Sequence, residues 1–329
     1  MEIPRLTVAI GHRYDSLYLR NGTVKIKGFD VEYATPPERS VAVKAESVEQ
    51  YIAPSSMFTA IATEASYDIG ELPLSTYLQS VDLGKDVIAI PVFPSRIFPH
   101  NLVSVHVNSE IRYPVDLVGK RFGIGFFSKN YSVWVRGVLR HQYDIPIEKI
   151  AWIEDQTEHF PEYRPPRRYT IEKVSSDQKL AALLEAGEID ALAAARGSQQ
   201  GFSKHARPLF DNPYSEIARF SGAQLFPVNT VVTIPKKTVA RNPGIAEAVF
   251  DAFQFALSLY LEDVTHGKRN DDHSGLSLKR LEAEAGILFP KYGFHANRET
   301  IKLMVQYCFE QGVISKLFDP EELFLLTDT

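Results

Sequence analysis

Cysteine is the rarest residue of this sequence, and its single example, Cys308, excludes an intrachain disulfide and a thiolate metal site. Cys308 lies at helical spacing from Ile301, Met304 and Val305, a pattern typical of a position in a hydrophobic core. The sequence therefore predicts a buried, unreactive thiol.

Long apolar runs are also missing. The most apolar stretches, residues 87–93 and 245–261, are too short or too interrupted to span a bilayer. Residues 1–6 lack the basic start and the apolar stretch of a secretion signal. We therefore expect a cytoplasmic protein with no membrane partner.

The sequence also has no excess of positively charged residues. The 36 lysine and arginine residues are outnumbered by 41 aspartate and glutamate residues, which gives a formal net charge of −5. This balance argues against nucleic acid or an anionic membrane surface as a partner. If the ligand is an anion, local cations must attract it.

The composition and the order of the expected elements indicate a folded α/β protein. A hydrophobic content of 44% with 23% charged residues is typical of globular proteins, and 329 residues fit two domains better than one core. Strands alternate with helices, which indicates mostly parallel sheets flanked by helices. The expected strands cover residues 6–10, 67–71, 86–92, 102–107, 189–194 and 228–234; the expected helices lie within residues 41–63, 128–142 and 176–185 and start again at Asn242; residues 154–168 form a long loop.

Polar residues follow several of these strands. In parallel sheets, ligands gather at the carboxyl ends of the strands. The residues in such positions are Arg13, Glu71, Ser75, Arg96, His100, Arg196 and Asn229. Residues 121–130 add a strand, a glycine turn and a helix start capped by Ser128 or Asn130, an arrangement that suits anions. We therefore predict an interlobe cleft for a small carboxylated molecule, lined by residues 94–100.

Several motifs resemble those of one known family. Residues 90–100, IPVFPSRIFPH, resemble the signature of the 4,5-dihydroxyphthalate decarboxylase family. Further similar segments follow in order at residues 116–123, 133–139, 186–192, 292–298, 310–312 and 320–324. The resemblance therefore covers nearly the whole chain.

This resemblance implies a fold and a reaction. The fold is that of type II periplasmic binding proteins, with residues 1–107 and 225–329 in one lobe and residues 108–224 in the other. The reaction is the non-oxidative loss of a carboxylate from 4,5-dihydroxyphthalate, or a close analogue, to give protocatechuate in phthalate degradation and aromatic catabolism. No cofactor and no metal are expected. The sequence departs from the family pattern at Ser16, Pro99, Asn130 and Asn229.

The reaction assigns roles to the candidate residues. Decarboxylation of an electron-rich ring needs a proton donor, an acceptor for the phenolic proton and cations for the remaining carboxylate. His100 is the expected proton donor or shuttle because its ordinary pKa is closest to neutrality, or else a histidine that bonds to the backbone at a strand end. Glu71 is the expected proton acceptor, or else a cap of the next helix.

Cations and hydrogen-bond donors complete the expected site. Arg96 and Arg136 suit bidentate binding of a carboxylate, although Arg136 could instead lie on a solvated helix face. Arg13 and Arg196 either reach the same anion or form surface salt bridges. The remaining expected substrate contacts are Ser75, Ser95, Asn130 and Asn229.

Other functions stay open at this stage. His12 with Asp15, or His100 with Glu71, could supply metal ligands, but no His-x-x-x-His motif supports a metal site, and no Gly-x-Ser-x-Gly motif supports a nucleophilic serine. The alternative function is a non-catalytic protein that binds a small carboxylate, and a third is another lyase or a cofactor-biosynthesis enzyme on this fold. A homo-oligomer is possible.

Overall fold

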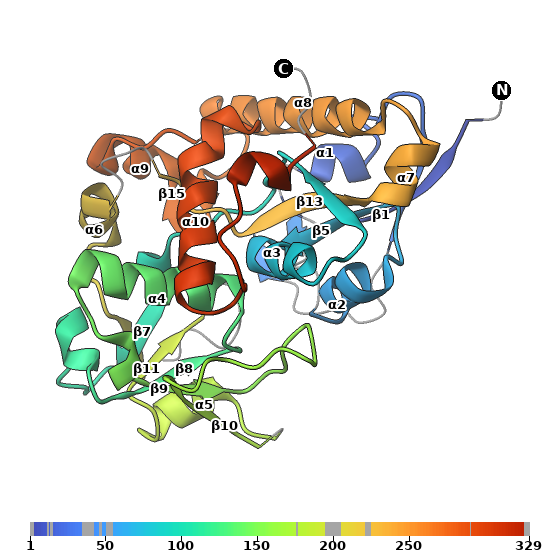
Figure 1. Ribbon diagram of the computed structural model, residues 1–329. Helices are drawn as coiled ribbons and strands as arrows, with labels where there is room; N and C mark the ends of the chain where they lie inside the picture. Colours follow the sequence, from blue (N-terminus) through green and yellow to red (C-terminus); the bar gives the residue numbers. More distant parts are fainter. Residues whose placement is uncertain are drawn as a thin grey trace.

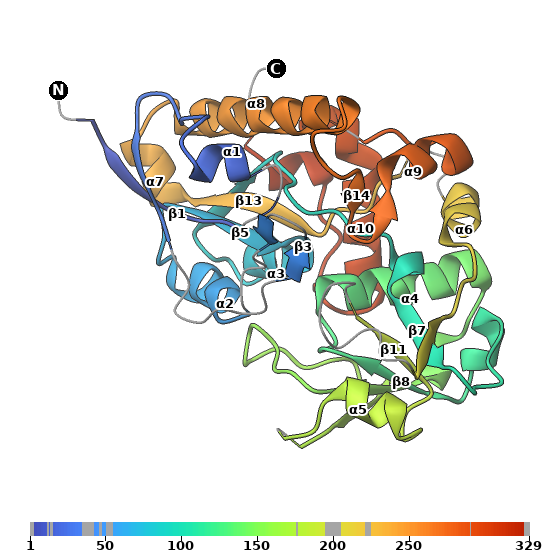
Figure 2. The ribbon, with the colours of Figure 1, turned by 180° about the vertical axis from the view of Figure 1, so that it is seen from behind.

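The computed structural model describes residues 3–11, 13, 16–34, 43–45, 48–50, 55–175, 177–194, 205–220, 225–289 and 291–325. Figure 1 shows these residues in two lobes, and Figure 2 shows the same arrangement from behind. Each lobe is built on one mixed β-sheet.

Lobe I contains a five-stranded sheet in the order β2-β1-β5-β13-β6. Its strands are β1 (Arg5–Ala9), β2 (Asp30–Tyr33), β5 (Ile69–Pro73), β6 (Val87–Ile90) and β13 (Thr230–Pro235). The helices of this lobe are α1 (Leu17–Arg20), α2 (Ser55–Glu64), α3 (Leu74–Asp82), α7 (Lys236–Arg241) and α8 (Ile245–Thr265). Strand β1 is parallel to β2 and β5, whereas β13 is antiparallel to β5 and β6. Every residue of β5 and β13 is buried, as expected of central strands covered on both faces.

Lobe II contains a six-stranded sheet in the order β10-β9-β8-β11-β7-β12. Its strands are β7 (Val103–His106), β8 (Arg121–Ile124), β9 (Ala151–Glu154), β10 (Thr170–Lys173), β11 (Ala191–Ala193) and β12 (Ala206–Pro208), and its helices are α4 (Asn130–Tyr143), α5 (Leu180–Glu185) and α6 (Pro213–Phe220). Strands β10, β9, β8 and β11 are parallel to one another, and β7 is antiparallel to both β11 and β12. The carboxyl ends of β8 and β9 therefore lie at one edge.

The remaining elements are short, apart from α10 (Arg298–Glu310). They are the hairpins β3 (Val43–Ala45) with β4 (Val48–Gln50) and β14 (Asp272–His273) with β15 (Leu276–Ser277), the helix α9 (Leu278–Ala285), and the 3₁₀ turns η1 (Pro99–Asn101), η2 (Pro114–Leu117), η3 (Ile147–Lys149), η4 (His295–Asn297) and η5 (Pro320–Leu323). Helix α10 contacts both α3 and α4, so it packs against each lobe.

Two segments connect the lobes, and they pair with each other. The chain leaves lobe I after β6 and returns before β13. Arg96 forms an antiparallel bridge with Val228, and the Ile97 N–H donates to the Pro227 carbonyl oxygen at 3.1 Å. The N–H of Asn229 donates to the Ser95 carbonyl oxygen at 2.8 Å. We call residues 94–102 and 225–229 the paired crossing.

The α/β prediction and most of the expected elements agree with this structure. Cys308 is fully buried, and α8 buries the predicted stripe of Ile245, Val249, Phe253, Ala256 and Tyr260. The helix expected within residues 41–63 is α2, and residues 43–45 and 48–50 of the same region are the paired strands β3 and β4. One boundary differs from the expectation. Strand β7 pairs in the lobe II sheet, which places the first crossing before residue 103 and not after residue 107.

Helix α4 approaches α10 closely because residue 137 is glycine. A Cβ atom at Gly137 would lie 2.0 Å from the ring of Tyr307. That ring is held by Trp134 in an edge contact at 5.6 Å and by His141 in a stacked contact at 5.0 Å. The absence of a side chain at Gly137 therefore sets the distance between the two helices.

We expect Gly137→Ala to destabilise the protein by about 2 kcal/mol, because overpacking outweighs the gain of about 1 kcal/mol in helix propensity. Urea unfolding followed by circular dichroism measures the change. Ser258→Ala, at an exposed position of α8, is the control and should change the free energy of unfolding by less than about 0.5 kcal/mol. Equal stability of the two variants would contradict the packing argument.

Candidate functional site

The N-terminal ends of α3 and α4 meet where the lobes touch. Asn130 Oδ1 accepts the backbone N–H of Ser75 at 2.9 Å, and Ser75 Oγ donates to the Ser128 carbonyl oxygen at 2.8 Å. Ser75, Ser128 and Asn130 are all buried. Two predicted residues, Ser75 from lobe I and Asn130 from lobe II, therefore lie in direct contact.

The paired crossing joins the same cluster. Asn130 Nδ2 donates to the Val228 carbonyl oxygen at 3.0 Å and to Asn229 Oδ1 at 3.3 Å. Asn229 Nδ2 donates in turn to Ser95 Oγ at 3.1 Å. The predicted residues Ser75, Ser95, Asn130 and Asn229 thus form one hydrogen-bonded group, which we call the junction cluster.

A second pair of predicted residues lies beside the end of β1. Arg13 Nη2 donates to Glu71 Oε2 at 2.5 Å, and the Gly11 N–H donates to the same oxygen at 2.9 Å. The Glu71 side chain is fully buried, and its Oε1 has no partner among the described residues. Ser16 shapes this turn, because its Oγ donates to the Gly11 carbonyl oxygen at 2.7 Å and accepts the Arg13 N–H at 2.8 Å.

One continuous segment contributes a residue to each of these two groups, Glu71 to the first and Ser75 to the junction cluster. Glu71 is in β5, and α3 begins directly after that strand at Leu74. Because a strand advances about 3.3 Å per residue, Glu71 lies roughly 10 Å from the start of α3.

An aromatic wall lies next to the junction cluster. His159 Nδ1 is 2.8 Å from Thr76 Oγ1, so this contact also joins the lobes. The His159 ring makes edge contacts with Phe126 at 4.9 Å and with Phe58 at 6.0 Å. Burial lowers the pKa of His159 to about 3, so its imidazole is neutral at pH 7.

Lys129, which precedes the first residue of α4, was not among the predicted site residues. Its Nζ donates to Gln156 Oε1 at 2.5 Å and lies 5.2 Å from the centre of the Phe126 ring. Burial lowers the Lys129 pKa to about 8. Its position at a helix start behind a strand-glycine turn was the available signal, but an isolated lysine in a loop is ordinarily solvated.

Arg96 lies within the body of lobe I. Its Nη1 donates to the Phe226 carbonyl oxygen at 3.1 Å and its Nη2 to Asn297 Oδ1 at 2.7 Å. The guanidinium also faces the rings of Phe93 and Phe226, at 5.5 and 5.6 Å. These contacts anchor the paired crossing to residues near the start of α10.

Arg136 is likewise wholly buried, and so does not lie on a solvated helix face. Its Nε donates to Gln311 Oε1 at 2.8 Å and its Nη2 to the Phe127 carbonyl oxygen at 2.6 Å, with the guanidinium 3.8 Å from the centre of the Phe127 ring. Burial lowers its pKa to about 10. The described contacts occupy two of its three nitrogens, and Nη1 has no partner among the described residues.

His100 lies at the opposite end of α4 from the junction cluster. Its Nε2 is 2.8 Å from Gln142 Oε1, and aromatic rings of Phe210 and Phe220 lie 5.6 and 5.4 Å away. Gln142 is 12 residues after Asn130, which corresponds to about 18 Å along a helix. Burial lowers the His100 pKa to about 4.

Three predicted residues, Arg196, His12 and Asp15, lie outside the described part of the chain. Within that part, no group of three or more histidine, cysteine, aspartate or glutamate side chains is arranged to hold a metal ion.

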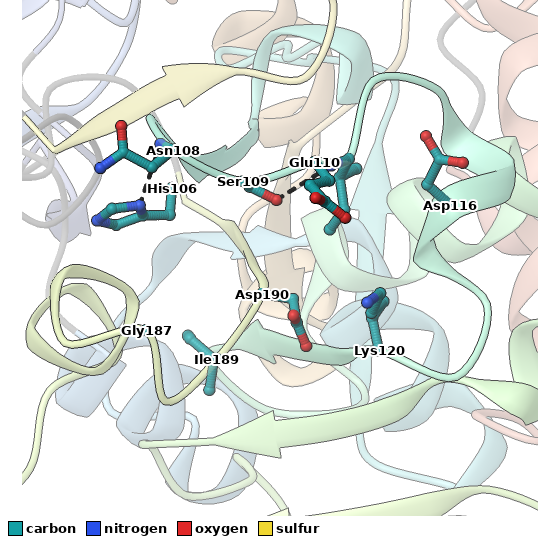
Figure 3. Close-up of a pocket in the computed structure, with 10 residues that line it drawn as sticks. His106, Asn108, Ser109, Glu110, Asp116, Lys120, Gly187, Ile189 and Asp190 are labelled. Atoms are coloured by element: carbon teal, nitrogen blue, oxygen red, sulfur yellow. Dashed lines mark hydrogen bonds between the residues drawn. The ribbon is translucent and has the colours of Figure 1, made fainter.

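A hollow of about 500 Å³ lies elsewhere on lobe II (Figure 3). Its lining includes His106, Lys120 and Asp190, which stand at the end of the antiparallel β7 and before β8 and β11. The hollow is therefore at the amino ends of the parallel strands, opposite the junction cluster.

The sequence was compared with known proteins. No family model matches it. A protein from Comamonas testosteroni named 4,5-dihydroxyphthalate decarboxylase is 27% identical over 333 residues, which cover 97% of this chain and 96% of that protein. A protein of the same name from Pseudomonas putida is 27% identical over 197 residues, covering 58% of this chain and 70% of that protein. The chain is a relative of the 4,5-dihydroxyphthalate decarboxylases. Both relatives are named as decarboxylases, which supports the prediction of an enzyme.

Solved structures confirm the fold of this decarboxylase relative. The aliphatic sulphonate binding protein SsuA from Escherichia coli has a TM-score of 0.57 at 15% identity, with 98% of each chain covered. A mutant of the desulfurization enzyme DszB in complex with biphenyl-2-sulfinic acid has a TM-score of 0.58 at 13% identity, covering 99% of this chain and 97% of that chain. The expected type II periplasmic-binding-protein-like fold is confirmed. Within the described residues, no helix is long and apolar enough to cross a membrane.

The hydrogen bonds of Asn130 in the junction cluster should contribute to the stability of the protein. Asn130→Leu keeps the approximate volume but leaves the buried Ser75 N–H without its acceptor and the Val228 carbonyl oxygen with Trp134 Nε1 as its remaining side-chain donor, so we expect a loss of about 2 kcal/mol in the free energy of unfolding. Urea unfolding measures this loss. Asn108→Leu, at an exposed position, is the control, and an equal effect of the two changes would refute the role of Asn130.

The low pKa of the buried His100 predicts how the stability of the protein depends on pH. Its folded pKa is near 4 and its unfolded value near 6.5, so the unfolded chain binds the proton first as the pH falls. Stability should therefore decrease from pH 6.5 to 4, with about 3 kcal/mol due to His100. Urea unfolding across this range should show a shallower decrease for His100→Phe. Parallel curves for the two proteins would contradict the assignment.

Proposed function

We propose that this chain catalyses the non-oxidative decarboxylation of an aromatic dicarboxylate, 4,5-dihydroxyphthalate or a close analogue. The observation that carries the proposal is the 27% identity to a 4,5-dihydroxyphthalate decarboxylase across 97% of the chain. A match of this extent includes both lobes and both crossings.

The chemistry is compatible with the polar groups between the lobes. In this reaction a proton adds to the ring carbon that carries a carboxylate, the bond from ring to carboxylate breaks, and CO₂ leaves. Withdrawal of a proton from the para hydroxyl makes that carbon more basic. We assign this withdrawal to Glu71, because its Oε1 has no partner in the described chain and Arg13 holds Oε2.

The remaining roles follow from position. The junction cluster offers hydroxyl and amide groups to a ligand between the lobes, and we assign it to substrate orientation. We assign Arg96, Arg136 and His100 to positioning, because their described contacts connect the paired crossing, α4 and α10. Thus the proposal differs from the sequence-based hypothesis of His100 as proton donor and of the two buried arginines as clamps.

A binding protein without chemistry is the second candidate. The observation that favours it is the fold shared with the sulphonate binding protein SsuA at a TM-score of 0.57. Such a protein would hold a small anion and release it unchanged. The two functions differ in turnover and can therefore be separated directly.

Incubation of the purified protein with 4,5-dihydroxyphthalate should release CO₂ and form protocatechuate, measured by liquid chromatography and a coupled CO₂ assay. Tight binding without product would refute the reaction and favour the binding function. A protocol without added metal or cofactor is the first test, followed by the same assay with divalent cations.

The Arg13–Glu71 pair should be needed for turnover. We expect Glu71→Gln to lower kcat about a hundredfold or more, as is usual when a general base is removed. The matched controls are Arg5→Gln and Glu32→Gln, because Arg5 and Glu32 form an exposed ion pair at 2.8 Å in the same sheet. Unchanged kcat in a folded Glu71→Gln protein would remove Glu71 from the mechanism.

A further inference from the structure

Lys129 is a cation that forms no salt bridge with a carboxylate of the described chain, although Asp155 acts on it electrostatically from a longer distance. Its side chain donates one hydrogen bond, to the neutral amide of Gln156, and no described acidic group lies within salt-bridge distance. By contrast, the guanidinium of Arg13 is paired with Glu71. A partly buried ammonium group loses hydration, and an anion is the group that compensates this loss best.

The absence of a side chain at Gly125 leaves room for this ammonium group. A Cβ atom at Gly125 would lie 2.9 Å from Lys129 Nζ and 2.9 Å from the Tyr131 hydroxyl oxygen. Any larger residue would push the lysine head group away from the loop after β8. The ammonium also lies 5.0 Å from the centre of the Tyr131 ring, so contacts from two sides fix its position.

The first turn of α4 supplies unpaired donors beside Lys129. The backbone N–H groups of Asn130, Tyr131 and Ser132 have no acceptor among the described residues. The Ser132 hydroxyl is wholly buried and also has no partner in the described chain. The start of this 14-residue helix carries the positive end of its dipole, which favours an anion at the same place.

We propose that Lys129 binds a carboxylate of the aromatic ligand, assisted by the first turn of α4. This inference rests on the proposed function only in taking an aromatic carboxylate as the ligand. The ring of such a ligand can pack against the aromatic wall of Phe126, His159 and Phe58, which adjoins the lysine. Lys129 thereby selects anionic over neutral aromatic molecules.

The proposal has a pH signature. Only the ammonium form of Lys129 attracts a carboxylate, and its pKa in the free protein is about 8, so affinity should fall about tenfold from pH 7 to pH 9. The titratable groups that face Lys129 are Asp155 and His159 after β9 and Tyr131 on α4. Arginine at this position stays charged over the whole range, so a Lys129→Arg variant should lose the pH dependence.

Isothermal titration calorimetry with phthalate tests the inference, because phthalate has both carboxylates but no hydroxyl groups to support turnover. We expect Lys129→Met to weaken binding about thirtyfold or more and Lys129→Arg to retain it at pH 7. The control is Lys149→Met, at an exposed position of lobe II. Circular dichroism verifies that each variant is folded.

Two results would overturn the inference. One is phthalate binding by folded Lys129→Met with the affinity of the unchanged protein, and the other is failure of the unchanged protein to bind phthalate at all. The proposed reaction fails separately: phthalate binding that depends on Lys129, together with no CO₂ release from 4,5-dihydroxyphthalate, would refute the decarboxylase and leave this inference intact.

Discussion

The paired crossing is the constraint on which the rest of the molecule depends. The two segments that connect the lobes need hydrogen-bond partners for their backbone N–H and C=O groups where they leave the sheets. They supply these partners to each other, as in the hydrogen bond from the Asn229 N–H to the Ser95 carbonyl oxygen. The Val228 carbonyl oxygen then accepts from both Trp134 Nε1 and Asn130 Nδ2, at 2.9 and 3.0 Å. One short segment therefore fixes the position of α4, and through α4 the position of every group at its N-terminal end.

This arrangement brings two helix starts together. Helix α3 follows the central strand β5 of lobe I, and α4 follows β8 of lobe II. Their amide groups point toward the same region, where Asn130 supplies an acceptor to α3 from the first turn of α4. A polar region with unpaired N–H groups, a lysine and an aromatic wall results, and it suits a small aromatic anion.

Buried cations have two different roles in this chain. Arg96 and Arg136 are surrounded by aromatic rings, carbonyl oxygens and amide oxygens of the protein, so they act as rigid internal connectors. Lys129 donates its described hydrogen bond to the neutral amide of Gln156 and lies between the carboxyl end of β8 and the start of α4. The shared fold cannot separate an enzyme from a binding protein, because both place their ligand at such an edge. The chemistry of individual side chains must therefore distinguish an enzyme from a binding protein.

The sequence by itself determined the α/β class, the buried stripe of α8, the buried Cys308 and the family resemblance, because local periodicity and the order of motifs along the chain need no knowledge of distant contacts. It also placed Ser75 after a strand and Asn130 at a helix start, whereas Asn229, which it placed after a strand, lies directly before β13. Only the tertiary structure decided which of these residues meet. An arginine fork or an imidazole has the same local sequence signal in a ligand site and in a core, so the interior positions of Arg96, Arg136 and His100 depended on the packing of α4, α10 and the crossing. The surroundings of Lys129, a neutral amide and aromatic rings without a salt bridge, depended on which side chains the fold brings to the start of α4.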